Sequence, residues 1–222
     1  METHQYTFLR HGKLDLPYRD HAEMPFSIFA DLGTDVLSPS IDESYAKERI
    51  KHLKGALQLQ MNAVLASPSR RCQETAAILR RAAAGIGGEV IPRTSVLLSE
   101  VEFDLRSLNA DDNVEAALAA HDIAAVNEAV FKGMISGEHC EPVERVYARV
   151  AQLFEELRDL QKPCICITHD FYMRVVELYI RRHGDKFRTI TLNDLVSTRR
   201  NRYLSGFATN SELVSFLPIE LA

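Results

Sequence analysis

The sequence predicts an α/β fold, a three-layer α/β/α sandwich with a mainly parallel central sheet. Short apolar segments of strand length alternate with amphipathic segments of helical period along the 222 residues, which is the pattern of a sheet covered by helices on both faces. The segment Cys164 to Thr168 (CICIT) is almost continuously apolar, as are strands buried on both faces of a parallel sheet. The length and the 46% hydrophobic content predict a single domain over residues 1–222.

The strands and helices follow from composition and period. Segments with the length and composition of strands are Gln5 to Leu9, Ala63 to Ala66, a stretch within 89–98, Cys164 to Thr168, and shorter extended pieces in 190–196 and 203–217. Apolar residues at helical spacing predict helices over 42–59, 71–84, 142–160 and 171–182. Hydroxyl caps in the turn Ser67-Pro68-Ser69 support the start of the second helix, and Gly85 to Gly88 would end it.

Two regions interrupt the alternation of strands and helices. Residues 13–40 contain three prolines and no sustained period, so we expect an irregular segment on the substrate side of the fold. Residues 101–141 hold an Ala-rich piece at 114–120 and a loop marked by Gly133 and Gly137. We expect this second region to form a cap or insertion above the sheet, and the two regions to determine which substrate binds.

Composition excludes several classes of protein. The formal net charge of -5 argues against general nucleic-acid binding. Residues 171–204 nevertheless hold eight Lys/Arg against three acids; this excess would attract an anionic ligand, although solvated helix and loop charges explain it equally well. No apolar stretch approaches the roughly 18 residues that span a bilayer, and the first residues do not resemble a secretory signal. We therefore expect a cytoplasmic protein with no membrane partner.

The four cysteines are too few and too irregularly spaced for a disulfide framework or a zinc site. Cys164 and Cys166 alternate with isoleucines and are expected to be buried strand residues. Cys72 follows two arginines, which would acidify an exposed thiol, but packing on a helix is the simpler interpretation. We expect all four thiols to be reduced.

Polar side chains follow each predicted strand. Because open parallel sheets bind ligands beyond the carboxyl ends of their strands, these side chains are expected to meet at one edge. They are Arg10, His11 and Gly12 after the first strand, Ser67 and Arg71 after the second, Glu100 after the third, and His169 after CICIT. Two arginines and two histidines in one place would form a cationic pocket suited to phosphate.

Within such a pocket, His11 is the natural nucleophile. Neighbouring positive charge favours its neutral imidazole, and a bond from one ring nitrogen to a backbone carbonyl would leave the other nitrogen to attack. Gly12 would let the backbone approach the phosphate closely. No metal is required when arginines supply the positive charge, so we expect no metal and no other cofactor.

Several motifs occur in order along nearly the whole chain. They are Leu9-Arg10-His11-Gly12, the run from Ser67 to Ala76 (SPSRRCQETA), Leu98-Ser99-Glu100, Gly137-Glu138 and Thr168-His169. In these motifs the chain resembles the histidine phosphatase, or phosphoglycerate mutase-like, superfamily, and the resemblance implies that fold. It also implies that His11 is transiently phosphorylated, that Arg10, Arg71 and His169 bind and neutralise the phosphoryl group, and that Glu100 protonates the leaving oxygen and then activates water.

At two places the sequence departs from the family pattern, and the proposed activity has two alternatives. Lys13-Leu14-Asp15 stands where the mutases have Glu and then Asn, and Asp170-Phe171 replaces the usual Gly-Gly. The first difference favours hydrolysis of a phosphomonoester, carried by a small molecule or a phosphoprotein, and the second would narrow the pocket or change its backbone contacts. A phosphomutase and a non-catalytic protein that binds a phosphorylated ligand are the alternatives.

Five other residues are assigned less directly. Glu102 and Asp104 lie close enough to Glu100 to be alternative acids. Gly12 and Ser67 are expected to contact substrate. Lys13 either reaches a second anionic group of the substrate or lies at the surface. The sequence leaves the substrate and the oligomeric state open.

Overall fold

The computed structural model describes residues 4–18, 23–34, 36–57, 63–83, 92–185 and 189–219. Within these ranges one mixed sheet has the strand order β3-β2-β4-β1-β5-β6. Its strands are β1 Gln5–Arg10, β2 Ala63–Ala66, β3 Pro92–Thr94, β4 Cys164–Thr168, β5 Gly206–Asn210 and β6 Leu217–Ile219. The first four strands pair in parallel, whereas β5 and β6 join antiparallel to the edge formed by β1. The predicted α/β class and mainly parallel sheet are therefore confirmed.

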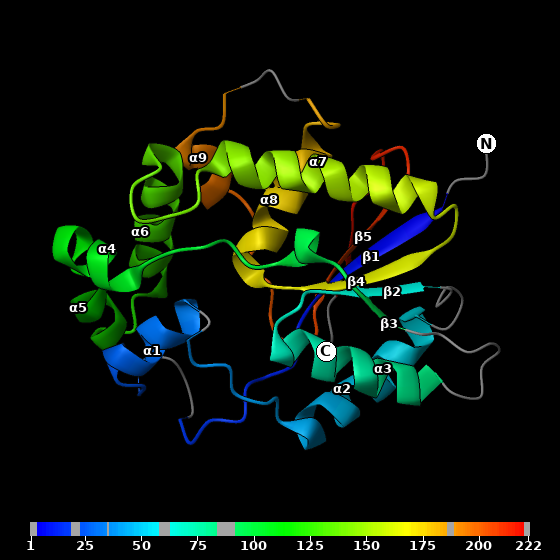
Figure 1. The fold of residues 1–222 in the computed structure, drawn as a ribbon, viewed down its shortest axis with the longest axis horizontal. Helices are drawn as coiled ribbons and strands as arrows, with labels where there is room; N and C mark the ends of the chain where they lie inside the picture. Colours follow the sequence, from blue (N-terminus) through cyan, green and yellow to red (C-terminus); the bar gives the residue numbers. More distant parts are fainter. Residues whose placement is uncertain are drawn as a thin grey trace.

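Helices cover both faces of this sheet (Figure 1). Those that cover the sheet are α2 Glu43–Leu57, α3 Arg70–Ala83, α7 Val143–Asp159 and α8 Asp170–Arg181. Figure 1 shows α7 and α8 on one face, and α2 and α3 on the other. In α7, Val146, Val150, Leu153 and Leu157 recur every three or four residues and are fully buried, so that one stripe of the helix packs on the sheet.

The alternation of side chains along each strand supplies two cores, one for each face. Tyr6 and Phe8 of β1 belong to the larger core, with α7 and α8, while Leu9 belongs to the smaller one, with α2 and α3. In β4, Cys166 faces the larger core and Ile165 the smaller. Both faces of the central strands are thus buried, and the continuous apolar run of CICIT is explained.

Except for one 3₁₀ turn, which packs on α7 and β4, the remaining helical segments lie beyond the carboxyl ends of the parallel strands (Figure 1). The turn is Val96–Leu98, and the others are α1 Phe26–Gly33, α4 Leu105–Asp112, α5 Val114–Ala119, α6 Ile123–Ser136 and α9 Leu192–Val196. Residues 101–141 supply α4, α5 and α6, which pack on one another and on the larger core. That these helices are an insertion, and that 1–222 is a single domain, stay predictions.

The loop expected at Gly133 is wrong, because Gly133 lies inside α6. A Cβ there would stand 2.6 Å from Cys140 Sγ, so the glycine permits close packing rather than a turn. Gly137 does end the helix, with a φ of 74°, a conformation that glycine adopts without strain.

Two other sequence expectations also fail. The segment 13–40 is not irregular throughout, since α1 begins after Pro25 and buries Ala30. Residues 192–196 form a helix, α9, rather than an extended piece. Gly85 to Gly88, expected to end α3, lie outside the described residues, as do Lys186 and Arg188 of the basic segment. Among the helices in the described ranges, none has the length and apolar character to cross a bilayer.

Candidate active site

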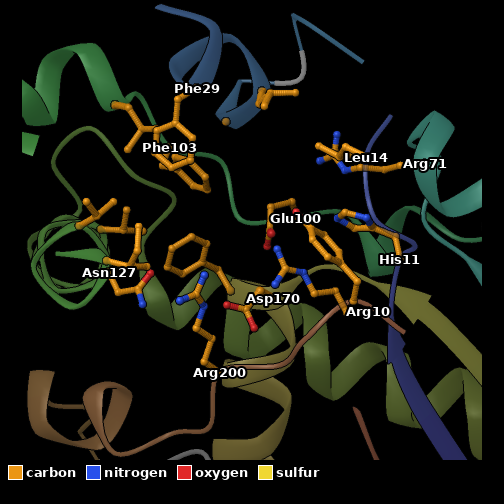
Figure 2. A pocket seen from close by; sticks show the side chains of 18 residues that line it. Arg10, His11, Leu14, Phe29, Arg71, Glu100, Phe103, Asn127, Asp170 and Arg200 are labelled. Atoms are coloured by element: carbon orange, nitrogen blue, oxygen red, sulfur yellow. The ribbon is translucent and has the colours of Figure 1, made fainter. Parts of the chain in front are cut away.

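The ends of β1, β2 and β4 are tied together by backbone hydrogen bonds. His11 N donates to Thr168 O, and Ser67 N donates to Ile167 O, both at 3.0 Å. These bonds extend the parallel ladder past the strand ends and bring the side chains that follow each strand to one edge. A pocket of about 120 Å³ opens there, and Arg10, His11, Arg71 and Glu100 all line it (Figure 2).

His11 is buried and oriented by its own turn. Its Nδ1 lies 2.8 Å from Gly12 O, so Nδ1–H donates to the carbonyl and the ring carries its lone pair on Nε2. This is the backbone bond that the sequence predicts. The ring centroid lies 5.3 Å from that of His169 and 5.6 Å from that of Tyr203, so aromatic contacts further restrict the orientation of the imidazole.

Thr75 of α3 links the turn at Gly12 to the helix that carries Arg71. Gly12 N donates to Thr75 Oγ1 at 2.9 Å, and this hydroxyl donates to Arg71 O at 2.7 Å. A Cβ at Gly12 would lie 3.1 Å from Ile41 Cδ1, so the glycine also fits a tight space. One buried hydroxyl therefore fixes the spacing between the turn after His11 and the first turn of α3.

His169, at the end of β4, is held as a neutral ring. Arg71 Nε donates to its Nδ1 at 3.3 Å, and its Nε2 lies 3.0 Å from Ser67 Oγ, as expected of a tautomer protonated at Nε2. Burial lowers the pKa of His169 well below its usual value, and the neighbouring charges of His11, Arg71 and Arg10 lower it further. Ser67 thus orients His169 and lines a larger, adjacent pocket, which Arg71, Glu100 and His169 also line.

Glu100 is the acid that lines the pocket together with His11 (Figure 2). Its Oε1 accepts hydrogen bonds from Val101 N at 3.0 Å and Tyr172 N at 2.9 Å. Burial raises the pKa of Glu100 to about 7, against the opposing effects of these two bonds and of Arg71. A carboxyl group with this pKa is poised to give or take a proton near neutral pH.

The two alternative acids line the larger adjacent pocket but not the smaller pocket that holds His11. Glu102 is exposed and lines only the larger adjacent pocket. Asp104 caps α4, accepting bonds from Arg106 N and Ser107 N, and hydrogen bonds to Ser107 hold its pKa below the usual range. The geometry therefore favours Glu100 among the three acids.

Arg149, in the middle of α7, supports the segment that carries Glu100. Its Nη1 donates to Ser99 O at 2.6 Å, its Nη2 donates to Glu141 Oε2 at 2.8 Å, and its guanidinium lies 4.8 Å from the ring centroid of Tyr172. Arg149 thus contacts both Ser99, just before Glu100, and Tyr172, whose N–H binds Glu100. No sequence motif singled out Arg149, because an arginine on a long helix ordinarily faces solvent.

The segment after α9 completes the wall beside Arg10. Arg10 Nη1 donates to Asn201 O at 2.7 Å, and its guanidinium lies 4.3 Å from the centroid of the Tyr203 ring. Asn201 N in turn donates to Asp170 Oδ1 at 2.7 Å. The sequence signalled this segment only as part of the basic stretch 171–204, so the contribution of Asn201 and Tyr203 was missed.

Other expected residues lie apart from the pocket. Lys13 is half-buried and lines neither the smaller nor the larger pocket. Cys72 is fully buried in the smaller core, and burial raises its pKa to about 12, which outweighs the lowering effect of Arg71, so the simpler packing interpretation fits. Within the described part of the chain, no cluster of His, Cys, Asp and Glu could hold a metal ion.

Comparisons with solved structures agree with this fold. "Mycobacterial hydrolase 1" superposes with a TM-score of 0.65 at 14% identity, covering 99% of this chain and 98% of that one. A phosphoglycerate mutase from Bacillus anthracis gives a TM-score of 0.61 at 14% identity, with 99% and 92% covered. A mycobacterial glucosyl-3-phosphoglycerate phosphatase gives 0.57 at 14% identity, with 98% and 97% covered. At these identities the likeness shows the fold alone.

Sequence comparison adds the family. No curated protein sequence matches the chain. The family model described as "Histidine phosphatase superfamily (branch 1)" matches residues 43–206, which is most of the chain and includes Arg71, Glu100 and His169. Arg10 and His11 precede the matched range, and the fold brings them into the same site. The chain therefore belongs to the histidine phosphatase superfamily.

Proposed function

We propose that the protein is a metal-independent phosphatase that hydrolyses a phosphomonoester through a phosphohistidine at His11. The observation that carries the proposal is one pocket in which a histidine oriented by a bond from Nδ1 to a backbone carbonyl, two arginines and an acid with a pKa of about 7 meet. Phosphoryl transfer requires positioning and charge stabilisation more than covalent help from the protein, and these groups supply both.

In the first step His11 Nε2 attacks phosphorus. A bond from Nε2 to phosphorus forms while the ester P–O bond breaks, and Glu100 donates its proton to the leaving oxygen. Arg10 and Arg71 stabilise the charge on the phosphoryl oxygens. General acid catalysis of this kind contributes about 10²- to 10⁴-fold.

In the second step the ionised Glu100 takes a proton from water. The water oxygen bonds to phosphorus, the P–N bond breaks, and inorganic phosphate leaves with the imidazole restored. In the unliganded site His169 accepts from Arg71 at Nδ1. A phosphoryl group that displaces this bond binds the Arg71 donor, and its negative charge favours protonation of His169 at Nδ1, so that the imidazole then donates as well.

The first experiment measures hydrolysis of phenyl phosphate in excess chelator, with the wild type, His11→Ala and His52→Ala. His52 is the matched control, because it is a largely exposed histidine on α2. Circular dichroism verifies that each variant is folded. Chelator-resistant turnover that disappears only in His11→Ala supports the proposal, and turnover that survives His11→Ala overturns the assignment of the nucleophile.

Two alternative functions predict different results when the same protein is given a phosphomonoester. A phosphomutase, suggested by the fold shared with a phosphoglycerate mutase, would return the phosphoryl group to a second hydroxyl, so that rapid-quench experiments would show transfer to an added alcohol rather than release of inorganic phosphate. A protein that only binds a phosphorylated ligand would show neither acid-labile phosphohistidine nor product. Either result would replace the hydrolase assignment.

A further inference from the structure

The pocket wall opposite His11 is apolar and comes from separate parts of the chain. It includes Phe29 and Leu32 of α1, Phe103 before α4, Val126 and Val130 of α6, and Phe171 of α8. Figure 2 shows Phe29 and Phe103 on the side of the pocket away from His11 and Arg71. A group bound there exchanges water for hydrocarbon, which is favourable for an apolar group and costly for a hydroxyl that finds no partner.

Aromatic contacts define the shape of this wall. The Phe171 ring centroid lies 5.3 Å from that of Phe103 and 5.7 Å from that of Phe131, both in edge-to-face geometry. The whole pocket, including the part at His11, has a volume of about 120 Å³, and a cavity of about 150 Å³ holds one benzene molecule. The apolar part therefore admits a group no larger than about one ring.

Two polar side chains interrupt the apolar lining at the same side of the pocket. Asn127 is half-buried on α6, and Arg200 is exposed in the segment after α9. Both line the pocket, and Figure 2 shows both away from His11 and Arg71, with Arg200 pointing toward the pocket beside Asp170. Across the described residues, neither side chain makes a hydrogen bond or an ion pair with another protein group.

The nearest carboxylate is already engaged. Asp170 Oδ2 accepts from Arg174 at 3.2 Å, and its Oδ1 accepts from Asn201 N at 2.7 Å. Asp170 and Arg200 interact through their charges, but the hydrogen-bond donors of the Arg200 guanidinium are left for a ligand. A guanidinium and an amide that line the same apolar pocket match a carboxylate, because both can donate to its oxygens.

We propose that the substrate is a phosphate monoester of one ring-sized apolar alcohol that carries a carboxylate. The ring packs against the apolar wall, the carboxylate binds Arg200 and Asn127, and the phosphate lies at His11. This inference rests on the proposed phosphatase function and narrows its substrate to small carboxylated aryl phosphates, in preference to sugar phosphates.

The test compares kcat/KM for phenyl phosphate, 3- and 4-carboxyphenyl phosphate and glucose 6-phosphate. The proteins are the wild type, Arg200→Gln and Arg202→Gln. Arg202 is the matched control, because it is exposed in the same segment but does not line the pocket. Charge-assisted hydrogen bonds contribute enough to change an equilibrium about tenfold or more, so the ratio of kcat/KM between a carboxyphenyl phosphate and phenyl phosphate should fall about tenfold in Arg200→Gln and stay as in the wild type in Arg202→Gln.

The outcomes separate this inference from the proposed function. Hydrolysis of phenyl phosphate with the same ratio in Arg200→Gln as in the wild type overturns the carboxylate site and leaves the phosphatase assignment intact. A kcat/KM for glucose 6-phosphate above that for phenyl phosphate overturns the apolar ring site. Absence of His11-dependent hydrolysis of every phosphate in the series overturns the proposed function and the inference with it.

Discussion

Replacing Glu100 with Gln tests the central electrostatic feature of the site through the stability of the protein. Burial raises the pKa of Glu100 to about 7, from an ordinary value of 4.5. Between pH 4.5 and 7 the unfolded chain releases this proton while the folded protein keeps it, so the free energy of unfolding falls as the pH rises through that window. Glutamine carries no charge and still offers an oxygen to Val101 N and Tyr172 N.

The size of the effect follows from the two pKa values. Each pH unit of difference corresponds to about 1.4 kcal/mol, so ionising the buried carboxyl group costs about 3 kcal/mol above pH 7. We therefore expect Glu100→Gln to gain about 3 kcal/mol over the wild type between pH 4.5 and pH 8. Because the general acid is lost, the same variant should also lose about 10²- to 10⁴-fold in kcat.

Urea unfolding at pH 4.5 and pH 8 measures the stability, with Glu102→Gln as the control for an exposed neighbouring carboxyl group. All other titrating groups are common to both proteins, so the change in the difference between variant and wild type isolates Glu100. A difference that is equal at the two pH values would show that Glu100 titrates as an ordinary carboxyl group, and the acid-base assignment would lose its physical basis.

Two further predictions concern the buried surroundings of the site. Thr75→Val should lower the free energy of unfolding by about 1–3 kcal/mol in urea titrations, because Gly12 N loses its partner in a buried position; a loss below about 0.5 kcal/mol would contradict this. All four cysteines are buried, and burial raises the pKa of both Cys72 and Cys140 to about 12. A colorimetric thiol reagent should therefore react at pH 8 only after unfolding in guanidinium, and rapid labelling of the native protein would refute the burial of these thiols.

The sheet could be predicted from sequence because its signals are local. The β-branched and aromatic residues of β1 and the apolar run of β4 reflect burial of both faces of these strands, so their composition alone predicts them. Helix α1 could not be predicted, since its formation depends on packing of Ala30 and Phe29 against distant elements and the prolines around it suggest a break. Helix α9 had a readable signal, the capping box of Thr191 and Asp194, but its five residues are too few for a visible period.

The residues of the candidate site likewise include some that the sequence reveals and some that only the tertiary structure reveals. His11, Arg71 and His169 could be found because each follows a strand or opens the helix after it. Arg149 could not, because its importance depends on the carbonyl of Ser99 lying beside the middle of α7. Arg200 and the apolar wall come from segments that only the tertiary structure brings together, and for that reason the sequence left the substrate open.

The charges of the site also determine how substrate binding changes its protonation. In the free enzyme, the charge of Arg71 opposes the rise in the pKa of Glu100 that burial causes. Burial lowers the pKa of His169, and the charges of Arg71 and Arg10 lower it further. A bound phosphate brings negative charge that offsets these arginines, and by the same Coulomb interaction it raises both pKa values. Glu100 should then stay protonated to a higher pH in the complex than in the free enzyme. The alkaline limit of kcat should therefore lie at higher pH than that of kcat/KM, since the first reports the complex and the second the free enzyme. Coincident limits in steady-state profiles would mean that the phosphate does not lie beside Glu100, and the acid would have to be sought elsewhere in the site.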